Sequence, residues 1–201
     1  MPGKILLSTA YLPPSEYFSH IINAEEVLIE KEENYLKQSY RNRCYILSAD
    51  GAHSLSVPVY LGSIHKTPVK EIRIDYSKRW QQVHLRAITS SYNSSPYFLY
   101  YYEKIERVIL SGHSFLIDLN MELLLTLMEI LKIEVKLSYT AEFMPVNGSL
   151  DDLRYEITPK KRSSYAPKKY IHVFTPAEGF TRGVSIIDLV FNMGPEAKNF
   201  L

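Results

Sequence analysis

The first thirty residues alternate apolar segments with short polar breaks, in the order of a strand, a helix and a second strand. Residues 4–9 predict a short buried strand, which Pro13 and Pro14 terminate. Apolar residues then recur at helical spacing over residues 15–23, where Ser15 can cap the helix. Residues 27–29 predict the second strand. This order is typical of a β-α-β unit, so we expect an α/β fold with a parallel strand pair.

The next apolar segments predict three further strands, over residues 44–48, 54–61 and 69–75. Ala49-Asp50-Gly51-Ala52 is a turn signal that makes the first two of them a hairpin. Pro58 lies in the middle strand and places it at an edge or a bulge. We therefore expect the sheet to become mixed.

The second half of the chain is mostly helical in its pattern. Helices are predicted over residues 77–92, 96–110, 115–132 and 185–192, and strands over residues 133–137 and 170–174. Residues 141–168 are weakly patterned and contain three prolines, so we expect a surface excursion, with a lid as one possible role. Its basic run at residues 160–162 either faces solvent or grips phosphate. The whole chain, 1–201, is expected to form one α/β domain, a mixed sheet with flanking helices.

Two segments follow the first two predicted strands, and both are rich in hydrogen-bonding side chains. Ligands of open α/β sheets collect beyond the carboxyl ends of parallel strands, so residues 11–14 and 34–43 should share one rim. Cations there suit an anion, and amides suit hydroxyl groups. The alternative is a solvated loop whose charges only keep the protein soluble. The candidate ligand-binding residues of the two segments are Tyr11, Asn34, Lys37, Gln38, Arg41, Asn42 and Arg43.

His84 is the candidate for proton transfer. It lies four residues after Trp80 on the predicted helix 77–92, so the two side chains share a face. If that face meets the rim, His84 can act as a general base, because histidine titrates near neutral pH. If the face meets the core, His84 is a hydrogen-bonded core residue. Asp188 and Asn192, also four apart, either order an arginine of residues 34–43 or face water.

Composition narrows the classes of function. The 23 Lys and Arg residues nearly balance the 22 Asp and Glu residues, so we expect neither nucleic acid nor a membrane as a partner, and a small anionic or sugar ligand instead. Cys44 is the single cysteine, which excludes an intramolecular disulfide and favours the cytoplasm; we expect it to be a buried hydrophobe. Glycine-rich phosphate loops and metal-ligand spacings are absent from the sequence, so no cofactor or metal is predicted.

Motifs along nearly the whole chain are similar to those of one known family. They include Tyr11-Leu-Pro-Pro14, the segment 34–43, Val57-Pro-Val59, Trp80 with His84, and the C-terminal residues from Gly179 to Pro195. Together these residues resemble the WbqC-like protein family, named for a member found among bacterial O-antigen biosynthesis genes. The resemblance implies a bacterial cytoplasmic protein of surface polysaccharide synthesis, such as a transferase that modifies an activated sugar. His172 stands where relatives commonly have glutamine.

Two hypotheses of function follow. In the first, the protein is a transferase that uses a nucleotide-activated sugar or an acyl or aminoacyl donor; the cations of residues 34–43 hold the anionic group, and His84 moves a proton. In the second, a non-catalytic binding or assembly protein of a polysaccharide pathway uses the same residues to hold a ligand. The enzyme hypothesis requires that His84 share a pocket with Arg41 and Arg43.

Overall fold

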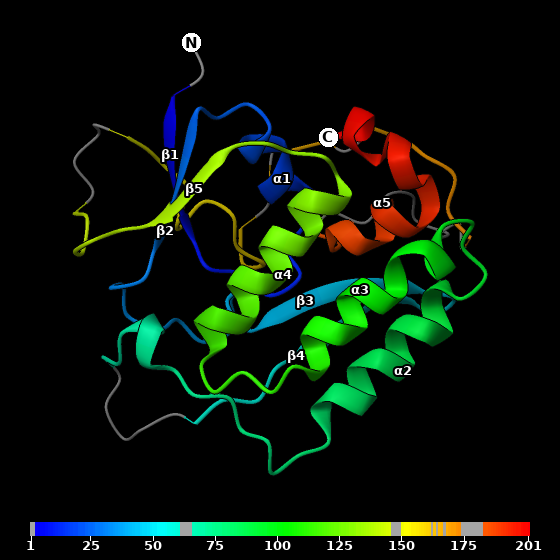
Figure 1. Ribbon diagram of the computed structural model, residues 1–201, viewed down its shortest axis with the longest axis horizontal. Coiled ribbons are helices and arrows are strands. Elements are labelled where there is room, and N and C mark those ends of the chain that lie inside the picture. The colour runs from blue at the N-terminus through cyan, green and yellow to red at the C-terminus, as the bar shows by residue number, and fades with distance from the viewer. Residues whose placement is uncertain are drawn as a thin grey trace.

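A four-stranded parallel sheet forms one half of the molecule in the computed structural model, which describes residues 3–60, 66–145, 150–161, 163, 165–166, 168–173 and 183–201. Its strand order is β5-β2-β1-β6 (Figure 1). The strands are β1 (Lys4–Ser8), β2 (Glu26–Glu30), β5 (Lys136–Tyr139) and β6 (Asp151–Asp152). Helix α1 (Ser15–Ile21) connects β1 to β2, which pair in parallel from Lys4 opposite Glu26 to Ser8 opposite Glu30. The predicted β-α-β unit is therefore confirmed.

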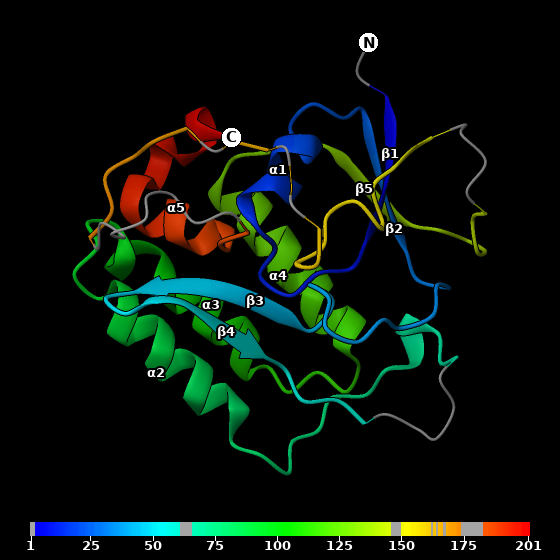
Figure 2. The ribbon, with the colours of Figure 1, turned by 180° about the vertical axis from the view of Figure 1, so that it is seen from behind.

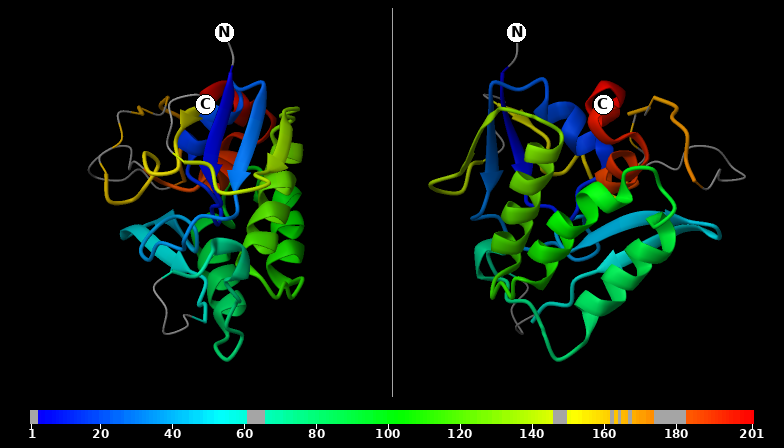
Figure 3. Two further views of the ribbon diagram at one scale, coloured as in Figure 1. Left: turned by 90° about the vertical axis from the view of Figure 1, so that its left-hand side faces the viewer. Right: turned by 45° about the vertical axis from the view of Figure 1, so that its right-hand side comes forward.

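The predicted hairpin is also confirmed, and it forms a sheet of its own. Strands β3 (Arg43–Ser48) and β4 (Gly51–Ser56) pair in antiparallel fashion around Gly51, whose φ of +111° suits glycine in a tight turn. Strand β4 ends at Ser56 because Pro58 cannot donate to a ladder. The α/β fold class is confirmed, with parallel and antiparallel pairing divided between two sheets (Figure 3).

Helices cover the hairpin and one side of the parallel sheet. Helix α2 (Trp80–Tyr92) contacts β3 and packs on α3 (Phe98–Leu110), which in turn packs on α4 (Leu116–Ile130). The views from opposite sides show the hairpin behind these helices in one and in front of them in the other (Figures 1 and 2). Leu119, Leu123 and Leu127 of α4 are fully buried at helical spacing, which confirms the predicted packing face. The chain closes with α5 (Ile186–Met193) and the 3₁₀-helix η2 (Gly194–Phe200).

Two strand predictions are wrong. The segment predicted over residues 69–75 forms the 3₁₀-helix η1 (Val69–Glu71) and then isolated bridges from Arg73 to Phe115 and from Ile74 to Val59. Val69 and Ile72 are both buried, and their spacing of three matches one 3₁₀ turn rather than the alternation of a strand. Residues 170–173 form no strand, and Phe174 lies outside the described residues. Strand β6 was not predicted, because it consists of only two acidic residues.

The surface excursion predicted over residues 141–168 is fixed to the parallel sheet at two described points. The backbone N–H of Met144 donates to the carboxylate of Glu30 on β2, at 2.9 Å. Arg154, which follows β6, is fully buried against the same carboxylate. Of the basic run, Lys161 pairs with Glu156 on the surface, and Arg162 lies outside the described residues, as do residues 146–149, 164 and 167. None of the described helices is both long and apolar enough to cross a membrane.

Candidate functional site

The segments that follow β1 and β2 meet, as predicted. The backbone N–H of Tyr11 donates to the carbonyl of Tyr40 at 2.8 Å, and the amide of Asn120 on α4 donates to the carbonyl of Arg41 at 2.8 Å. These bonds tie residues 34–43 to the carboxyl end of the sheet. The side chains of this segment, however, point into two different environments, and only one of them is a pocket.

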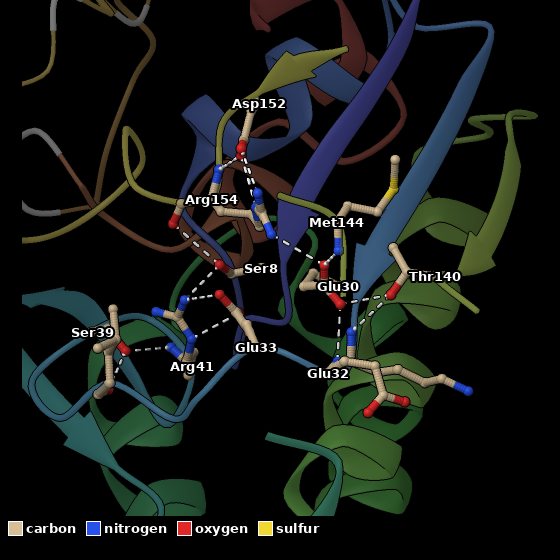
Figure 4. A network of polar contacts seen from close by, with 12 residues as sticks. Ser8, Glu30, Glu32, Glu33, Ser39, Arg41, Thr140, Met144, Asp152 and Arg154 are labelled. Carbon is tan, nitrogen blue, oxygen red and sulfur yellow. Dashed lines mark hydrogen bonds and ion pairs between the residues drawn. The ribbon is translucent and has the colours of Figure 1, made fainter. Parts of the chain in front are cut away.

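Arg41 belongs to a buried ionic network (Figure 4). Its Nε and Nη2 donate to the two carboxylate oxygens of Glu33 at 2.9 and 2.6 Å, and Nη2 also donates to Ser8 Oγ at 2.7 Å. Both side chains are almost completely buried. A bidentate pair of this kind satisfies both charges inside the protein. The guanidinium of Arg41 therefore already has an anionic partner, and Arg41 does not line the large cavity described below.

A second arginine extends the same network. Arg154 donates to Glu30 at 3.1 Å and to both carboxylate oxygens of Asp152, and its hydrogen bonds hold the pKa of Asp152 below the ordinary value. Glu30 also accepts from Thr140 Oγ1 at 2.7 Å. These side chains occupy the carboxyl end of the parallel sheet, where a cavity of only about 10 Å³ remains. That volume holds about one water molecule, so a larger ligand has no room there.

A cavity of about 640 Å³ lies between the hairpin, the segment 35–43 and the start of α2. Four of the predicted ligand-binding residues line it, namely Lys37, Gln38, Asn42 and Arg43, and so does His84. We call this cavity the cationic pocket. The enzyme hypothesis requires that His84 share a pocket with Arg41 and Arg43. His84 shares this pocket with Arg43 but not with Arg41.

Twelve further lining residues of the cationic pocket were not among the predicted site residues, and five of these carry charged or aromatic side chains. These five are Tyr35, Asp75, Lys78, Arg79 and Trp80. The charged run from Asp75 to Arg79 overlaps the start of the helix expected over residues 77–92, and it carried a signal, because a helix N-terminus with adjacent cations attracts anions. Without the fold, nothing linked this run to residues 37–43, which lie more than thirty positions earlier in the chain.

Short hydrogen bonds hold the first wall of the pocket in place. Arg43 Nε donates to Ser56 Oγ at 2.9 Å across the hairpin, and Asn42 Nδ2 donates to the carbonyl of Val57 at 2.8 Å. Gln38 has a φ of +56°, the left-handed region that few residues other than glycine adopt. Such strained positions concentrate at functional sites, and here the turn directs Lys37 and Gln38 towards the pocket.

The second wall is the start of α2. Arg79 is the N-cap residue, no side chain caps the helix, and the first intrahelical bond runs from Val83 N–H to the carbonyl of Arg79. The partial positive charge of the helix N-terminus therefore adds to the charges of Lys78 and Arg79. The indole Nε1–H of Trp80 is buried, and no described group accepts a hydrogen bond from it.

His84 forms the inner end of this wall and is held as a neutral imidazole. Its Nδ1 lies 2.9 Å from the hydroxyl of Tyr11, and its ring packs against that of Trp80 with centroids 5.1 Å apart. Burial lowers the pKa of His84 to about 4, although a hydrogen bond with the backbone of Ser56 acts in the opposite direction. A neutral imidazole then accepts from Tyr11 through Nδ1 and donates to Ser56 through Nε2. Tyr11 thus supports the pocket from behind and does not line it.

Asp75 is the carboxylate of the cationic pocket. Its Oδ1 accepts from the backbone N–H of Ser77 at 2.9 Å. Hydrogen bonds from Ser77, and a further one from Tyr60, lower the pKa of Asp75, so the side chain is ionised at neutral pH. An ionised carboxylate accepts hydrogen bonds from hydroxyl groups, which gives the pocket a second kind of recognition beside its cations.

The remaining predicted residues lie elsewhere. Asp188 is buried on α5, where its carboxylate accepts from the hydroxyl of Tyr170 and lies 3.0 Å from His172 Nδ1. Asn192 donates to the backbone of Asp188 and lines a second cavity of about 430 Å³ next to the end of α2. Both side chains are buried, and none of their described contacts is with Arg41 or Arg43, so these residues neither order an arginine of residues 34–43 nor face water. Asn34 is exposed and, among the described residues, forms a backbone bridge with Pro68.

Fold and pocket together define an α/β protein with a cavity lined by cationic side chains, and the comparisons with known proteins name its family. The model of the WbqC-like protein family matches residues 9–173, and the chain belongs to this family. The chain is similar to "Uncharacterized protein Rv1507c" of Mycobacterium tuberculosis (strain ATCC 25618 / H37Rv), with 25% identity over 227 aligned residues that cover 100% of this chain and 98% of that protein. No solved structure gives a match.

Proposed function

We propose that the protein is a cytoplasmic transferase of bacterial surface polysaccharide (O-antigen) synthesis whose cationic pocket binds an activated donor. The donor is a nucleotide-activated sugar or an acyl or aminoacyl compound. The observation that carries this proposal is the composition of one cavity. Its described lining includes one carboxylate, Asp75, and four cations, namely Lys37, Arg43, Lys78 and Arg79. Such a wall favours an anionic ligand with hydroxyl groups.

The size and the apolar part of the pocket support the same class of ligand. A cavity of about 640 Å³ lies in the range of small-molecule and cofactor sites. Tyr35 and Trp80 supply flat aromatic surfaces beside the cations. Aromatic faces stack on nucleobases and sugar rings, while fixed cations hold phosphate. Membership of the WbqC-like family agrees with a role connected with polysaccharide.

In the catalytic form of the proposal, His84 takes the proton of the acceptor group. One observation favours the second candidate function, a non-catalytic ligand-binding or assembly protein of the same pathway. His84 has a pKa of about 4 and shares its Nδ1 with the Tyr11 hydroxyl, so it is a weak base whose lone pair is already occupied. Both candidates use the same pocket and differ only in turnover.

Thermal unfolding in the presence of candidate donors tests the site. A ligand present at a hundred times its Kd adds about 2.7 kcal/mol to the free energy of unfolding, which raises Tm measurably. We expect a nucleotide sugar or an acyl donor to raise the Tm of the wild-type protein, and the variant Lys37→Gln/Arg43→Gln to lose that rise. Arg107→Gln, an exposed position on α3 outside the pocket, is the matched control. An equal rise in the double variant would refute this site.

Turnover separates the two candidate functions. The donor that stabilises the protein is incubated with it and with polysaccharide acceptors, and donor consumption is followed. Consumption that His84→Gln abolishes, with the donor Kd unchanged, supports the transferase. Binding without consumption by the wild-type protein supports the non-catalytic candidate.

A further inference from the structure

We propose that the cationic pocket recognises a diphosphate diester and that its own Lys and Arg side chains, rather than a divalent metal ion, neutralise the two phosphates. This inference rests on the proposed function, because it names the group of the donor that the same pocket holds. A diphosphate diester links the two halves of a sugar nucleotide and also occurs in an acyl-coenzyme A. The chemistry is thus common to two of the donor classes.

The charge of the pocket wall fits two phosphates better than one carboxylate. Among the described lining residues, four cationic side chains stand against one carboxylate, Asp75, and His84 is neutral, so the net charge of these residues is +3. A diphosphate diester brings two negative charges and a carboxylate only one. An aminoacyl group carries a positive ammonium, which these cations repel. The balance therefore favours the diphosphate among the donors considered.

The four cations come from two walls of the pocket, so two neighbouring phosphates can each meet cations from a different wall. Lys37 and Arg43 come from the hairpin side, whereas Lys78 and Arg79 come from the start of α2. The hydrogen bond that fixes Arg43 uses Nε, which leaves the two terminal nitrogens for a ligand among the described contacts. A guanidinium binds phosphate oxygens in bidentate fashion. The N-terminus of α2, a helix of thirteen residues whose first turn has no side-chain cap, adds partial positive charge.

The donor set of the pocket is poor for a divalent cation. Mg²⁺ beside a diphosphate is usually held by one or two carboxylates. Asp75 is the one carboxylate among the described lining residues, and its oxygens already accept hydrogen bonds from Ser77 and Tyr60. Over the described residues, no group of three or more His, Cys, Asp or Glu side chains could hold a metal ion. Neutralisation of the phosphates then falls to the four cations.

Calorimetric titration of the full chain tests the inference with three probes, UDP-glucose, acetyl-coenzyme A and UMP, each in EDTA and in Mg²⁺. We expect at least one of the two diesters to bind in EDTA with the same Kd as in Mg²⁺, and the better of the two names the donor class. UMP carries nearly the same charge on a single phosphate, and it should bind at least about tenfold more weakly, because one phosphate cannot meet the cations of both pocket walls. Higher salt should weaken diester binding, because the pairing is ionic.

Variants of the pocket residues test whether the diester binds at this pocket. Arg43→Gln/Arg79→Gln should weaken diester binding at least about tenfold in EDTA, whereas Arg107→Gln should leave it unchanged. Diester binding that requires Mg²⁺, or UMP binding as tight as that of the diesters, overturns the inference and leaves the proposed function standing. Failure of both diesters to bind in EDTA and in Mg²⁺ also overturns the inference, whereas the proposed function is contradicted only if no donor, aminoacyl compounds included, raises Tm in the thermal-unfolding experiment.

Discussion

Arg41 and Glu33 form a bidentate ion pair in the interior, with hydrogen bonds of 2.9 and 2.6 Å between the guanidinium and the two carboxylate oxygens. Only two positions further along the chain, Arg43 lines the cationic pocket. Two arginines of one short polar segment therefore have different roles, one in holding the fold and one in facing a ligand. Because their roles differ, replacement of Arg41 and replacement of Arg43 should change the free energy of unfolding by different amounts.

Replacement of Arg41 by Ala should destabilise the protein by about 3–5 kcal/mol, because it leaves the buried Glu33 carboxylate without its partner. Arg43→Ala removes a half-exposed side chain and should change the free energy of unfolding by about 1 kcal/mol or less. Urea unfolding of the two variants and the wild-type protein measures both values. Similar losses in the two variants would contradict this difference in roles.

His84 should make the stability of the protein depend on pH. Its pKa is about 4 in the folded protein and 6.5 in the unfolded chain, so the unfolded state binds more protons between these values. The stabilisation is complete above about pH 6.5 and is lost as the pH falls towards 4, by an amount on the order of 3 kcal/mol.

The wild-type protein and His84→Gln are compared by urea unfolding at several pH values between 4 and 7. The variant lacks the titrating group, so the difference between the two free energies should grow with pH across this window. A difference that stays constant would show that His84 keeps an ordinary pKa. His84→Gln is also the variant of the turnover experiment. Its measured stability therefore shows whether a loss of turnover comes from unfolding or from the missing imidazole.

Cys44 should be inert in the folded protein. It is almost fully buried on β3, and burial raises the pKa of its thiol well above the ordinary value, so little thiolate forms near neutral pH. We expect an aromatic disulfide reagent to modify the thiol only after unfolding in urea. Full modification within seconds under native conditions would mean that β3 opens readily.

Arg154 should anchor the segment that follows β6. It bridges Asp152 and Glu30 from a fully buried position. In Arg154→Ala, we expect chymotrypsin to cleave after Tyr155 much faster than in the wild-type protein, while Lys161→Ala, which breaks only the surface pair with Glu156, should not change the rate. Equal cleavage in all three proteins would argue against the anchor.

The sequence predicted the order of elements better than the direction of side chains. The β-α-β unit, the hairpin and the apolar face of α4 follow from local periodicity, which depends on neighbouring residues only. Whether Arg41 or Arg43 turns inward depends on Glu33 and Ser8, and Arg154 meets Glu30 across 124 positions of the chain. No local pattern carries such pairings. Asp75, Lys78 and Arg79 were missed for the same reason, since only the fold brings them to the segment 37–43.

The central claim is that the ligand lies between residues 37–43 and the start of α2. The position of a bound donor in a crystal structure of the complex tests it most directly. We predict density for the donor in the cationic pocket, with its anionic group within hydrogen-bonding distance of Arg43 and Arg79. A donor bound instead in the cavity beside Asn192, or on the exposed surface, would contradict this account.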